Sequence, residues 1–543
     1  MPDDSDPHET TATQTEAIAF LAQPTSFGAG IATVERIETH GALLFLAGSN
    51  VYKIKRAVRF PYMDFSTLEK RHAALAREFE INRPQAPELY LGLVAITRGP
   101  DGALKLGGEG EGECESGREV VEWALRMRRF PADALLSRVA ESRGIDAGLA
   151  RDLADAVVTY HAAAAVAPSP PDPAEQYGRL IAQVVDGLEA AGWNSSPRPA
   201  FGEAGEEGPP LKRLRQACDQ RLALALPILE RRVAAGCVRR CHGDLHLDNI
   251  VLWNGCPTMF DALEFDEALA TIDTSYDLAF LLMDLERHGR HAAANVVLNR
   301  MLWRTQAMLD IEGLAALPLF MALRAGIRAM VRAQRAAQAH EAPDAQRWTE
   351  VADYLTLALG LLSPPPPRLI AVGGVSGTGK STLAASLAPH IGAVPGAVHL
   401  RSDLERKAML GVGETDRLPP ETYTRETSDR VYALVLEKAR AALSAGHSVI
   451  VDAASLQAEE KARIEAVAAA TGVPFAGLWL TAPADVLRSR VQARTGDASD
   501  ATVDVLEKQM SWGPHADGWT LIDAGGSAST ALAEALASLP AVD

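Results

Sequence analysis

Residues 374–381 read Gly-Val-Ser-Gly-Thr-Gly-Lys-Ser and match in full the phosphate-binding pattern G-x-x-x-x-G-K-[ST]. Glycines in such a loop let successive backbone N–H groups turn toward a phosphate, and the following helix adds its positive end. Lys380 is expected to neutralise β- and γ-phosphate charge, and the Ser381 hydroxyl to hold Mg²⁺. An apolar strand precedes the loop and a helix begins at Lys380, which favours this reading over an ordinary glycine turn. The loop residues expected to contact nucleotide are Gly374, Ser376, Gly377, Thr378, Gly379, Lys380, Ser381 and Thr382.

Two carboxylates and two arginines follow at positions suited to the same reaction. Asp403 comes at the C-terminal end of the second strand, where side chains of parallel sheets project toward ligands, and we expect it to face the γ-phosphate and an acceptor hydroxyl. Capping the next helix is its alternative role. Asp452 ends the apolar strand 448–451 and is expected to hold the metal's water shell. Arg490 and Arg494 would share one helix face and close over the phosphates, unless that face is an ordinary basic surface.

The pattern covers residues 368 to about 540. It combines the phosphate loop, Ser-Asp-x-x-Arg-Lys at 402–407, a strand that ends in Asp-Ala, and an arginine lid followed by Asp-Ala-Ser-Asp-Ala at 497–501. It resembles the P-loop kinase group that includes polynucleotide 5′-hydroxyl kinases, zeta-type toxins and related small-molecule kinases. The resemblance implies that Asp403 is the general base and that Arg406 contacts the acceptor or a phosphate.

A second phosphoryl-transfer pattern stands in the first region. Residues 241–250 read Cys-His-Gly-Asp-Leu-His-Leu-Asp-Asn-Ile, and residues 259–264 read Met-Phe-Asp-Ala-Leu-Glu. An Asp, an Asn five residues later and an Asp seventeen residues after the first have the spacing of a kinase catalytic loop and its metal-binding aspartate. Asp244 would accept or orient the proton of an acceptor hydroxyl, while Asn249 and Asp261 would hold Mg²⁺. The alternative is a polar turn whose histidines cap or pack.

These residues resemble the aminoglycoside phosphotransferase-like branch of the protein-kinase fold, whose H-G-D-x-H-x-x-N loop is present here. Residues 272–279, Ile-Asp-Thr-Ser-Tyr-Asp-Leu-Ala, resemble its D-x-x-x-D-L-A element, which supports the catalytic loop from a helix start. The resemblance covers roughly residues 30 to 360. No G-x-G-x-x-G is present to cover the phosphates, and Asp261 continues as Asp-Ala-Leu instead of Asp-Phe-Gly. The branch commonly lacks both features, which favours a small-molecule kinase over a protein kinase.

The same resemblance implies a phosphate-pairing lysine on the strand at 51–55. Two lysines share one face of that strand, and Lys53 is favoured over Lys55. The helix around 68–83 offers Glu78 as the ion-pair partner of the lysine, with Glu80 as the alternative. An exposed helix face with solvated charges is the competing interpretation.

The elements that position these residues follow from hydrophobic patterning. Apolar runs alternate with helical segments after residue 368, which indicates a parallel sheet wrapped by helices. Before it, short strand-like runs precede mostly helix, which predicts a small β-rich lobe and a larger helical lobe. We therefore predict an α+β bilobal kinase-like domain followed by an α/β P-loop kinase domain. The predicted boundaries are a disordered tail at 1–15, the kinase-like domain at 16–362, a proline-rich linker at 363–367 and the P-loop domain at 368–543.

Composition limits the partners and the compartment. The chain has 543 residues and a net charge of −17, and it lacks an aromatic-basic strip, so nucleic acid is an unlikely acceptor, although the C-terminal domain does not exclude it. Five cysteines are few for this length and favour a reducing compartment. Cys237 and Cys241 with His242 and His246 could suggest zinc, but no second C-x-x-C arm exists. The polar N-terminus and the lack of a long uncharged apolar stretch predict a cytoplasmic protein without a membrane span.

The sequence thus predicts two phosphotransferase modules that each use Mg²⁺-ATP and an acceptor hydroxyl, which we expect to belong to a small molecule. This order of modules resembles bacterial proteins described as fused aminoglycoside phosphotransferase-like and AAA-type ATP-binding. One alternative is a nucleotide sensor, in which one module binds ATP without chemistry and regulates the other module or a partner protein. A second alternative, ranked last, is an ATPase motor.

Overall fold

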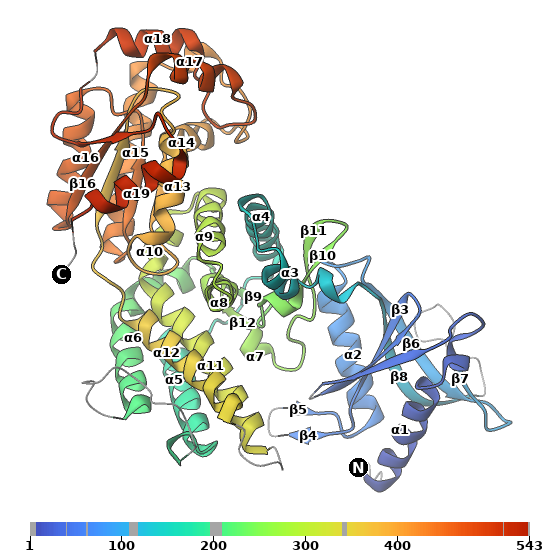
Figure 1. Cartoon of the computed structure of the whole chain (residues 1–543). Helices are drawn as coiled ribbons and strands as arrows, with labels where there is room; N and C mark the ends of the chain where they lie inside the picture. Colours follow the sequence, from blue (N-terminus) through green and yellow to red (C-terminus); the bar gives the residue numbers. More distant parts are fainter. Residues whose placement is uncertain are drawn as a thin grey trace. The chain divides into compact units, whose positions relative to one another are not determined.

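Figure 1 shows the computed structural model of the chain, which describes residues 7–39, 41–60, 63–107, 118–195, 209–338, 345–513 and 515–540. The chain forms two compact units, and each is described by itself. The first unit comprises Met1–Gly144, Tyr160–Ala167 and Val238–Asp277. The second unit comprises Ile145–Thr159, Pro168–Cys237 and Leu278–Asp543. The proline-rich segment 363–367 lies inside the second unit, so most of the predicted helical lobe groups with the P-loop domain.

The first unit is built on an antiparallel sheet with the strand order β1-β2-β3-β8-β6-β7. Successive residues of a strand point to opposite faces, and β3 shows this clearly. Tyr52 and Ile54 pack toward one face with Leu21 of α1, whereas Val51 packs toward the other face with Leu75 of α2. The elements are α1 (Pro7–Leu21), β1 (Val34–Glu38), β2 (Ala42–Ala47), β3 (Asn50–Lys55), α2 (Leu68–Asn82), β6 (Tyr90–Arg98), β7 (Leu104–Leu106) and β8 (Glu119–Arg128).

The N-terminus corrects one sequence prediction. Residues 1–6 of the predicted disordered tail lie outside the described part of the chain, but from Pro7 onward the prediction is wrong because α1 forms there. The contacts of Gln14 explain why this segment is ordered as a helix. Its Nε2 donates to Lys55 O at 2.9 Å and to Glu122 Oε2 at 2.8 Å, and its Oε1 accepts the N–H of Ala57 at 2.7 Å. Polar composition predicted disorder, but this buried amide ties the helix to the sheet.

A hairpin in the first unit fixes the spacing of the predicted catalytic residues. Strands β10 (Ile250–Trp253) and β11 (Cys256–Met259) pair antiparallel and are joined by Asn254 and Gly255, both at positive φ. An Asn-Gly pair with positive φ at both positions is the preferred two-residue hairpin turn. The hairpin therefore carries the chain from Asn249 back to Asp261. The flanking elements are β9 (Val238–Arg240), β12 (Thr271–Asp273), which pairs with β9, and α7 (Glu267–Ala270).

The helical part of the second unit includes α5 (Pro173–Ala190), α6 (Pro210–Ala234), α11 (Leu317–Gln338) and α12 (Ala345–Leu362), which pack together as Figure 1 shows. One segment, Met308–Ala337, has the length and hydropathy of a membrane span. However, 78% of its apolar window is buried inside the protein, as expected for a core helix of a bundle. Helix α10 (Met308–Glu312) is the first part of this segment, and α9 (His291–Thr305) precedes it. Helices α4 (Ala147–Ala163) and α8 (Thr274–Arg287) each continue from one unit into the other.

The P-loop domain in the second unit has a parallel five-stranded sheet with the order β14-β15-β13-β16-β17. Its central strands are buried along their whole length, as expected where helices cover both faces of a sheet. The predicted fold class is confirmed. The strands are β13 (Leu369–Gly373), β14 (Val398–Arg401), β15 (Val449–Asp452), β16 (Phe475–Thr481) and β17 (Thr520–Asp523). The helices are α13 (Lys380–Leu387), α14 (Ser402–Met409), α15 (Arg425–Ser444), α16 (Ala458–Thr471), α17 (Ala484–Ala493), α18 (Val503–Ser511) and α19 (Ala528–Ser538).

Candidate active sites

The first candidate site begins with two lysines on one face of β3. Glu78 of α2 is fully buried and binds both of them, with Lys53 Nζ 2.8 Å from Oε1 and Lys55 Nζ 2.7 Å from Oε2. Glu80, the alternative partner, is exposed and pairs with Arg77 at 2.8 Å. The structure therefore brings Glu78, and not Glu80, to the lysines.

The two lysines differ in their second partner. Lys53 Nζ lies 2.6 Å from Asp261 Oδ1, and Lys55 Nζ lies 2.5 Å from Glu264 Oε1. Burial alone would lower the pKa of Lys53, but the charges of Asp261 and Glu78 outweigh it and raise that pKa well above the ordinary value. Lys53 is thus held protonated beside the predicted metal ligand, which is the place where a phosphate-pairing lysine is needed. Glu264 was not identified from the sequence.

Asp277 binds the backbone of the predicted catalytic loop, residues 242–249. Its buried carboxylate accepts the backbone N–H of His242 at 3.2 Å and that of Gly243 at 2.9 Å, and His161 Nε2 lies 2.9 Å away. Gly243 has φ +83°, and a Cβ there would lie 3.1 Å from Leu263 Cβ, so the turn needs glycine. Asp277 is therefore placed to fix the backbone immediately before Asp244.

Asp244 and Asn249 meet as the spacing predicts. Asn249 Nδ2 donates to Asp244 O at 2.9 Å and to Asp244 Oδ2 at 3.0 Å, and His246 Nε2 lies 3.3 Å from the same carboxylate. The Asp244 side chain is 40% exposed, which leaves it accessible to a substrate. His246 thus orients Asp244, a role that the sequence alone did not assign.

Asp261 sits in a constrained backbone position, with φ +59°. Its N–H donates to Tyr90 Oη at 2.9 Å, and the N–H of Ala262 donates to Asn82 Oδ1 at 2.8 Å. Burial would raise the pKa of the Asp261 carboxyl, but the charge and hydrogen bond of Lys53 keep it below the ordinary value. Tyr90 and Asn82 therefore aim an ionised carboxylate at the site. Asn82 lies one turn after Glu78 on α2, a spacing that could have indicated it.

The residues considered for zinc have other partners in the structure. Cys241 Sγ lies 3.5 Å from Ile272 O, and His242 Nε2 lies 3.0 Å from Phe260 O. Cys241 also lies near His161 and Asp277, within 4.8 Å between ligand atoms. The carboxylate of Asp277 is, however, engaged by the catalytic loop.

The second candidate site is the phosphate loop between β13 and α13. Gly374, Gly377 and Gly379 all have positive φ, and a Cβ at Gly377 would lie 2.9 Å from Leu487 O. Lys380 begins α13, as predicted, and its Nζ donates to Val375 O at 3.0 Å. Burial lowers the pKa of Lys380, although Asp452 and Asp403 act in the opposite direction. A lysine in this state gains from an added anionic ligand.

Four more predicted residues lie in this loop or in the helix that follows it. Thr378 Oγ1 donates to Val375 O at 2.9 Å, and the Ser376 N–H donates to Gln509 Oε1 at 2.8 Å. Gln509 belongs to α18 and was not identified from the sequence. Its amide oxygen takes a loop N–H of the kind that binds phosphate oxygens. Ser381 and Thr382 lie in the first turn of α13.

Asp452 ends strand β15, and Asp403 follows the end of the neighbouring strand β14. Asp452 ends β15 and is buried, with its Oδ2 3.2 Å from His399 Nε2 and 3.6 Å from Arg401 Nε. Burial would raise the pKa of Asp452, but its hydrogen bond to His399 and the charges of His399, Arg401 and Lys380 lower it to about 2. Asp403 behaves in the opposite way, because burial and the charge of Asp452 raise its pKa above the ordinary value.

Asp403 does not cap α14. The helix begins at Ser402, its N-cap is Arg401, and no side chain caps it. Asp403 therefore lies inside the first turn, with its carboxyl directed at neighbours that include Lys380 and Ser499. A half-buried carboxyl whose pKa is raised and which interacts with a phosphate-loop lysine is suited to take up a proton during transfer.

The predicted arginine lid is wrong in part. Arg490 and Arg494 do not share a helix face, because α17 ends at Ala493 and Arg494 continues in extended backbone. Arg490 Nη1 donates to Ala524 O at 2.8 Å. Arg494 Nε lies 3.2 Å from Asp497 Oδ2, and Arg401 Nη2 lies 3.2 Å from Asp497 Oδ1. Helical periodicity suggested the pair, but the helix ends one residue too early.

Arg406 is a buried cation with spare donors. Its guanidinium stacks on the Tyr423 ring at 4.9 Å from the centroid, and its Nη2 lies 3.2 Å from Ser428 Oγ. Within the described part of the chain, Nε and Nη1 of Arg406 are buried and have no hydrogen-bond partner. Such a group is costly unless an anion completes its interactions. Tyr423 is itself tied to Asp500, with Oη 2.6 Å from Oδ2.

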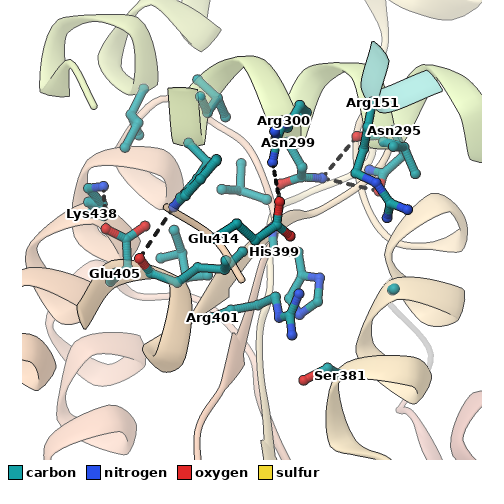
Figure 2. A pocket seen from close by; sticks show the side chains of 18 residues that line it. Arg151, Asn295, Asn299, Arg300, Ser381, His399, Arg401, Glu405, Glu414 and Lys438 are labelled. Atoms are coloured by element: carbon teal, nitrogen blue, oxygen red, sulfur yellow. Dashed lines mark hydrogen bonds and ion pairs between the residues drawn. The ribbon is translucent and has the colours of Figure 1, made fainter. Parts of the chain in front are cut away.

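A cavity of about 140 Å³ adjoins this site within the second unit. Figure 2 shows that α9 forms one wall, with Asn295, Asn299 and Arg300, and that Ser381, His399 and Arg401 of the P-loop domain line the other. Arg300 pairs with Asp155 through two bonds of 2.8 Å and with Glu414 at 2.5 Å. Helix α9, which is outside the P-loop domain, thus lines the same cavity as Ser381, which follows the phosphate loop.

Comparisons with known proteins show what the chain is similar to. The family model described as an AAA domain matches residues 369–513. The uncharacterized protein Rv2004c of Mycobacterium tuberculosis is 31% identical over 488 residues, which cover 88% of this chain and 90% of that protein. Among solved structures, a choline kinase of Cryptosporidium parvum is 10% identical and covers 65% of this chain and 94% of its own, with a TM-score of 0.39. A gluconokinase of Sinorhizobium meliloti is 22% identical and covers 32% of this chain and 91% of its own, with a TM-score of 0.25. The match to an AAA domain confirms the predicted P-loop domain over residues 369–513.

Proposed function

This chain belongs to the family of the mycobacterial protein Rv2004c, and from that premise we propose that it is a double phosphotransferase in which each active site transfers the γ-phosphoryl group of ATP to a hydroxyl group. One observation carries the proposal. In each unit a lysine lies among carboxylates in a cluster that includes an acidic residue suited to act on a hydroxyl proton. In the first unit Lys53 pairs with Asp261, whose pKa the charge of Asp244 affects, and in the second unit Lys380 and Asp403 affect each other's pKa. We further propose a cytoplasmic enzyme, since the reaction draws on ATP.

In the first unit Lys53 neutralises phosphate charge, and Glu78 keeps the lysine in place. Asn249 and Asp261 offer an amide oxygen and a carboxylate, and such oxygen donors suit Mg²⁺. Bound there, the ion would neutralise charge on the triphosphate. Asp244 orients the acceptor hydroxyl and receives its proton, with His246 and Asn249 holding the carboxylate.

In the second unit the loop N–H groups and Lys380 bind the phosphates, while Ser381 and Asp452 supply the oxygen donors that suit Mg²⁺. The acceptor oxygen forms a bond to the γ-phosphorus as the bond from that phosphorus to the β–γ bridging oxygen breaks. The hydroxyl proton passes to Asp403, and ADP leaves with the electron pair of the broken bond. Arg494 lies near enough to Lys380 for its charge to lower the pKa of that lysine, and it can add to the neutralisation of phosphate charge.

Arg406 supports a class of acceptor for the second unit. Arg406, which carries two unpartnered donors, lies within one turn of Asp403 along α14. An anionic group on the acceptor, a carboxylate or a phosphate, would complete them. The proposed acceptor is therefore a small hydroxylated molecule that carries an anion.

The experiment incubates the full chain with Mg²⁺ and γ-labelled ATP and a panel of neutral sugars, sugar acids, sugar phosphates, aminoglycosides, nucleosides and RNA ends. Two variants assign each product to a site, since Lys380→Ala should abolish transfer by the second unit only and Asp261→Asn transfer by the first only. Arg406→Met should raise the KM for an anionic acceptor at least tenfold and leave the KM for ATP unchanged. ATP binding at both sites without transfer to any acceptor would instead support the nucleotide sensor.

A further inference from the structure

The outer edge of strand β14 is covered by a helix. In the sheet order β14 is an edge strand, so its backbone groups on one side have no neighbouring strand. Unpaired backbone groups at a buried edge are costly. Helix α9 supplies the missing partners through two asparagines one turn apart, Asn295 and Asn299, which both donate from Nδ2 to Ala397 O at 3.1 Å.

Asn299 also bonds Asn295, with Nδ2 3.1 Å from Asn295 Oδ1, and it alone of the two bonds the backbone of His399. Its Oδ1 accepts the backbone N–H of His399 at 2.7 Å. The side-chain amide of Asn299 thus satisfies one carbonyl and one N–H of the edge, as a neighbouring strand would. Asn295 reaches the carbonyl but has no described bond to His399.

His399 links this edge to the metal-binding carboxylate. Its ring is largely buried, and Nε2 lies 3.2 Å from Asp452 Oδ2. In Figure 2 the His399 ring and Ser381 lie on the P-loop side of the cavity that Asn299 faces from α9. A chain of two hydrogen bonds therefore runs from Asn299 through the backbone and ring of His399 to Asp452.

We propose that Asn299 is a positioning residue for the metal site of the P-loop domain, acting through His399 on Asp452. The inference rests on the proposed function, in which Asp452 and Ser381 hold Mg²⁺. Removing a group that orients a metal-binding residue typically lowers metal affinity by about 10–100-fold. It follows that α9, which lies outside residues 369–513, is part of the second active site.

Other contacts of α9 support this role. Trp303 Nε1 donates at 3.3 Å to the carbonyl of Leu404, the residue after Asp403. Arg300 binds Glu414, which follows α14. Helix α9 thus contacts β14 and α14 directly and reaches Asp452 of β15 through His399.

The test compares Asn299→Ala with Asn295→Ala in the full chain, both on an Asp261→Asn background that disables the first metal site. Each variant removes one bond to Ala397 O and the bond between the two asparagine side chains, but only Asn299→Ala releases the N–H of His399. Isothermal titration with a non-hydrolysable ATP analogue at several Mg²⁺ concentrations gives the half-saturating Mg²⁺ concentration. We expect Asn299→Ala to raise it about tenfold or more and Asn295→Ala to leave it within about twofold. Binding of the analogue without metal should be the same for both.

Two more variants separate positioning from folding. Asn299→Asp keeps the acceptor for the His399 N–H and should retain most of the wild-type Mg²⁺ dependence even if Asn299→Ala folds poorly. On a His399→Ala background, Asn299→Ala should add little further change, since the link is already broken. Equal shifts for Asn295→Ala and Asn299→Ala, or full additivity with His399→Ala, would overturn the inference alone. If the background chain shows no Mg²⁺-dependent nucleotide binding, the proposed function of the second unit fails, and the inference fails with it.

Discussion

Replacing Glu78 by Gln tests the arrangement of the first site most directly. Glu78 is fully buried and bonds Lys53 at 2.8 Å and Lys55 at 2.7 Å. Breaking a buried ion pair by removing one partner costs about 3–5 kcal/mol, because a charge is left without compensation. Each lysine keeps a second carboxylate, Asp261 or Glu264, so we expect the lower end, about 3 kcal/mol.

Glu80→Gln is the matched control on the same helix. Its pair with Arg77 is exposed, with side chains 69% and 38% accessible, and such pairs contribute about 0–1 kcal/mol. Hydrogen–deuterium exchange of the full chain, followed in peptides that cover α2 and β3, measures the local opening free energy. At about 1.4 kcal/mol per tenfold change, Glu78→Gln should speed exchange there about a hundredfold, and Glu80→Gln no more than a fewfold.

The same pair of variants separates the sites functionally. Lys53 loses its anchor in Glu78→Gln, so Mg²⁺-nucleotide binding by the first unit should weaken, whereas binding at the phosphate loop should not change. Equal exchange rates in the two variants would refute the reasoning. So would a larger effect from Glu80, because the helix would then present its other face to β3.

Three further outcomes are expected. Lys380→Ala should remove most ATP turnover by the second unit with little change in melting temperature, since the lysine contributes ligand contacts more than core packing; turnover at the wild-type level would contradict the assignment. Asp403→Asn should lower transfer by ~10² or more at nearly unchanged ATP affinity. Burial raises the pKa of Asp403 above 3.8, and a general base acts only when it is deprotonated. Wild-type transfer should therefore fall as the pH drops through that raised pKa, while Asp452, with a pKa of about 2, stays ionised. A transfer rate that does not fall at acidic pH above 3.8 would exclude Asp403 as the base. With the second site disabled by Lys380→Ala, Asp261→Asn should lose Mg²⁺-dependent nucleotide binding in calorimetry, whereas Asp244→Asn should keep binding and lose transfer; identical behaviour of the two variants would remove the distinction between metal ligand and base.

The sequence determined the parts whose chemistry resides in a continuous stretch of backbone. The phosphate loop needs glycines, a lysine and a hydroxyl at fixed offsets, and positive φ at Gly377 and Gly379 agrees with that need. The loop from His242 to Asn249 is likewise local, and the Asn254-Gly255 turn sets the distance from it to Asp261. Alternation of apolar strands and helices was enough to predict the parallel sheet.

For Glu78 and Glu80, the sequence limited the alternatives and the packing of α2 decided between them. Glu78 and Glu80 are two residues apart, which is about 200° around a helix, so only one of them can face the sheet. Leu75 and Phe79 pack on the sheet face of α2, and Glu78 shares that face with them. The composition of the helix did not show which side would be buried, and packing against β3 decided it.

Other features were decided by the tertiary structure alone. The link from Gln509 to the phosphate loop spans 133 residues, and that from Asn299 to His399 spans 100. Each depends on how one element packs on another, and a polar residue on a helix gives no local sign of its distant partner. Arg490 shows the converse, because a regular i, i+4 spacing lost its meaning where α17 ended at Ala493. Local backbone chemistry can be read from neighbouring residues, whereas long-range pairing is set by the packing free energy of the whole unit.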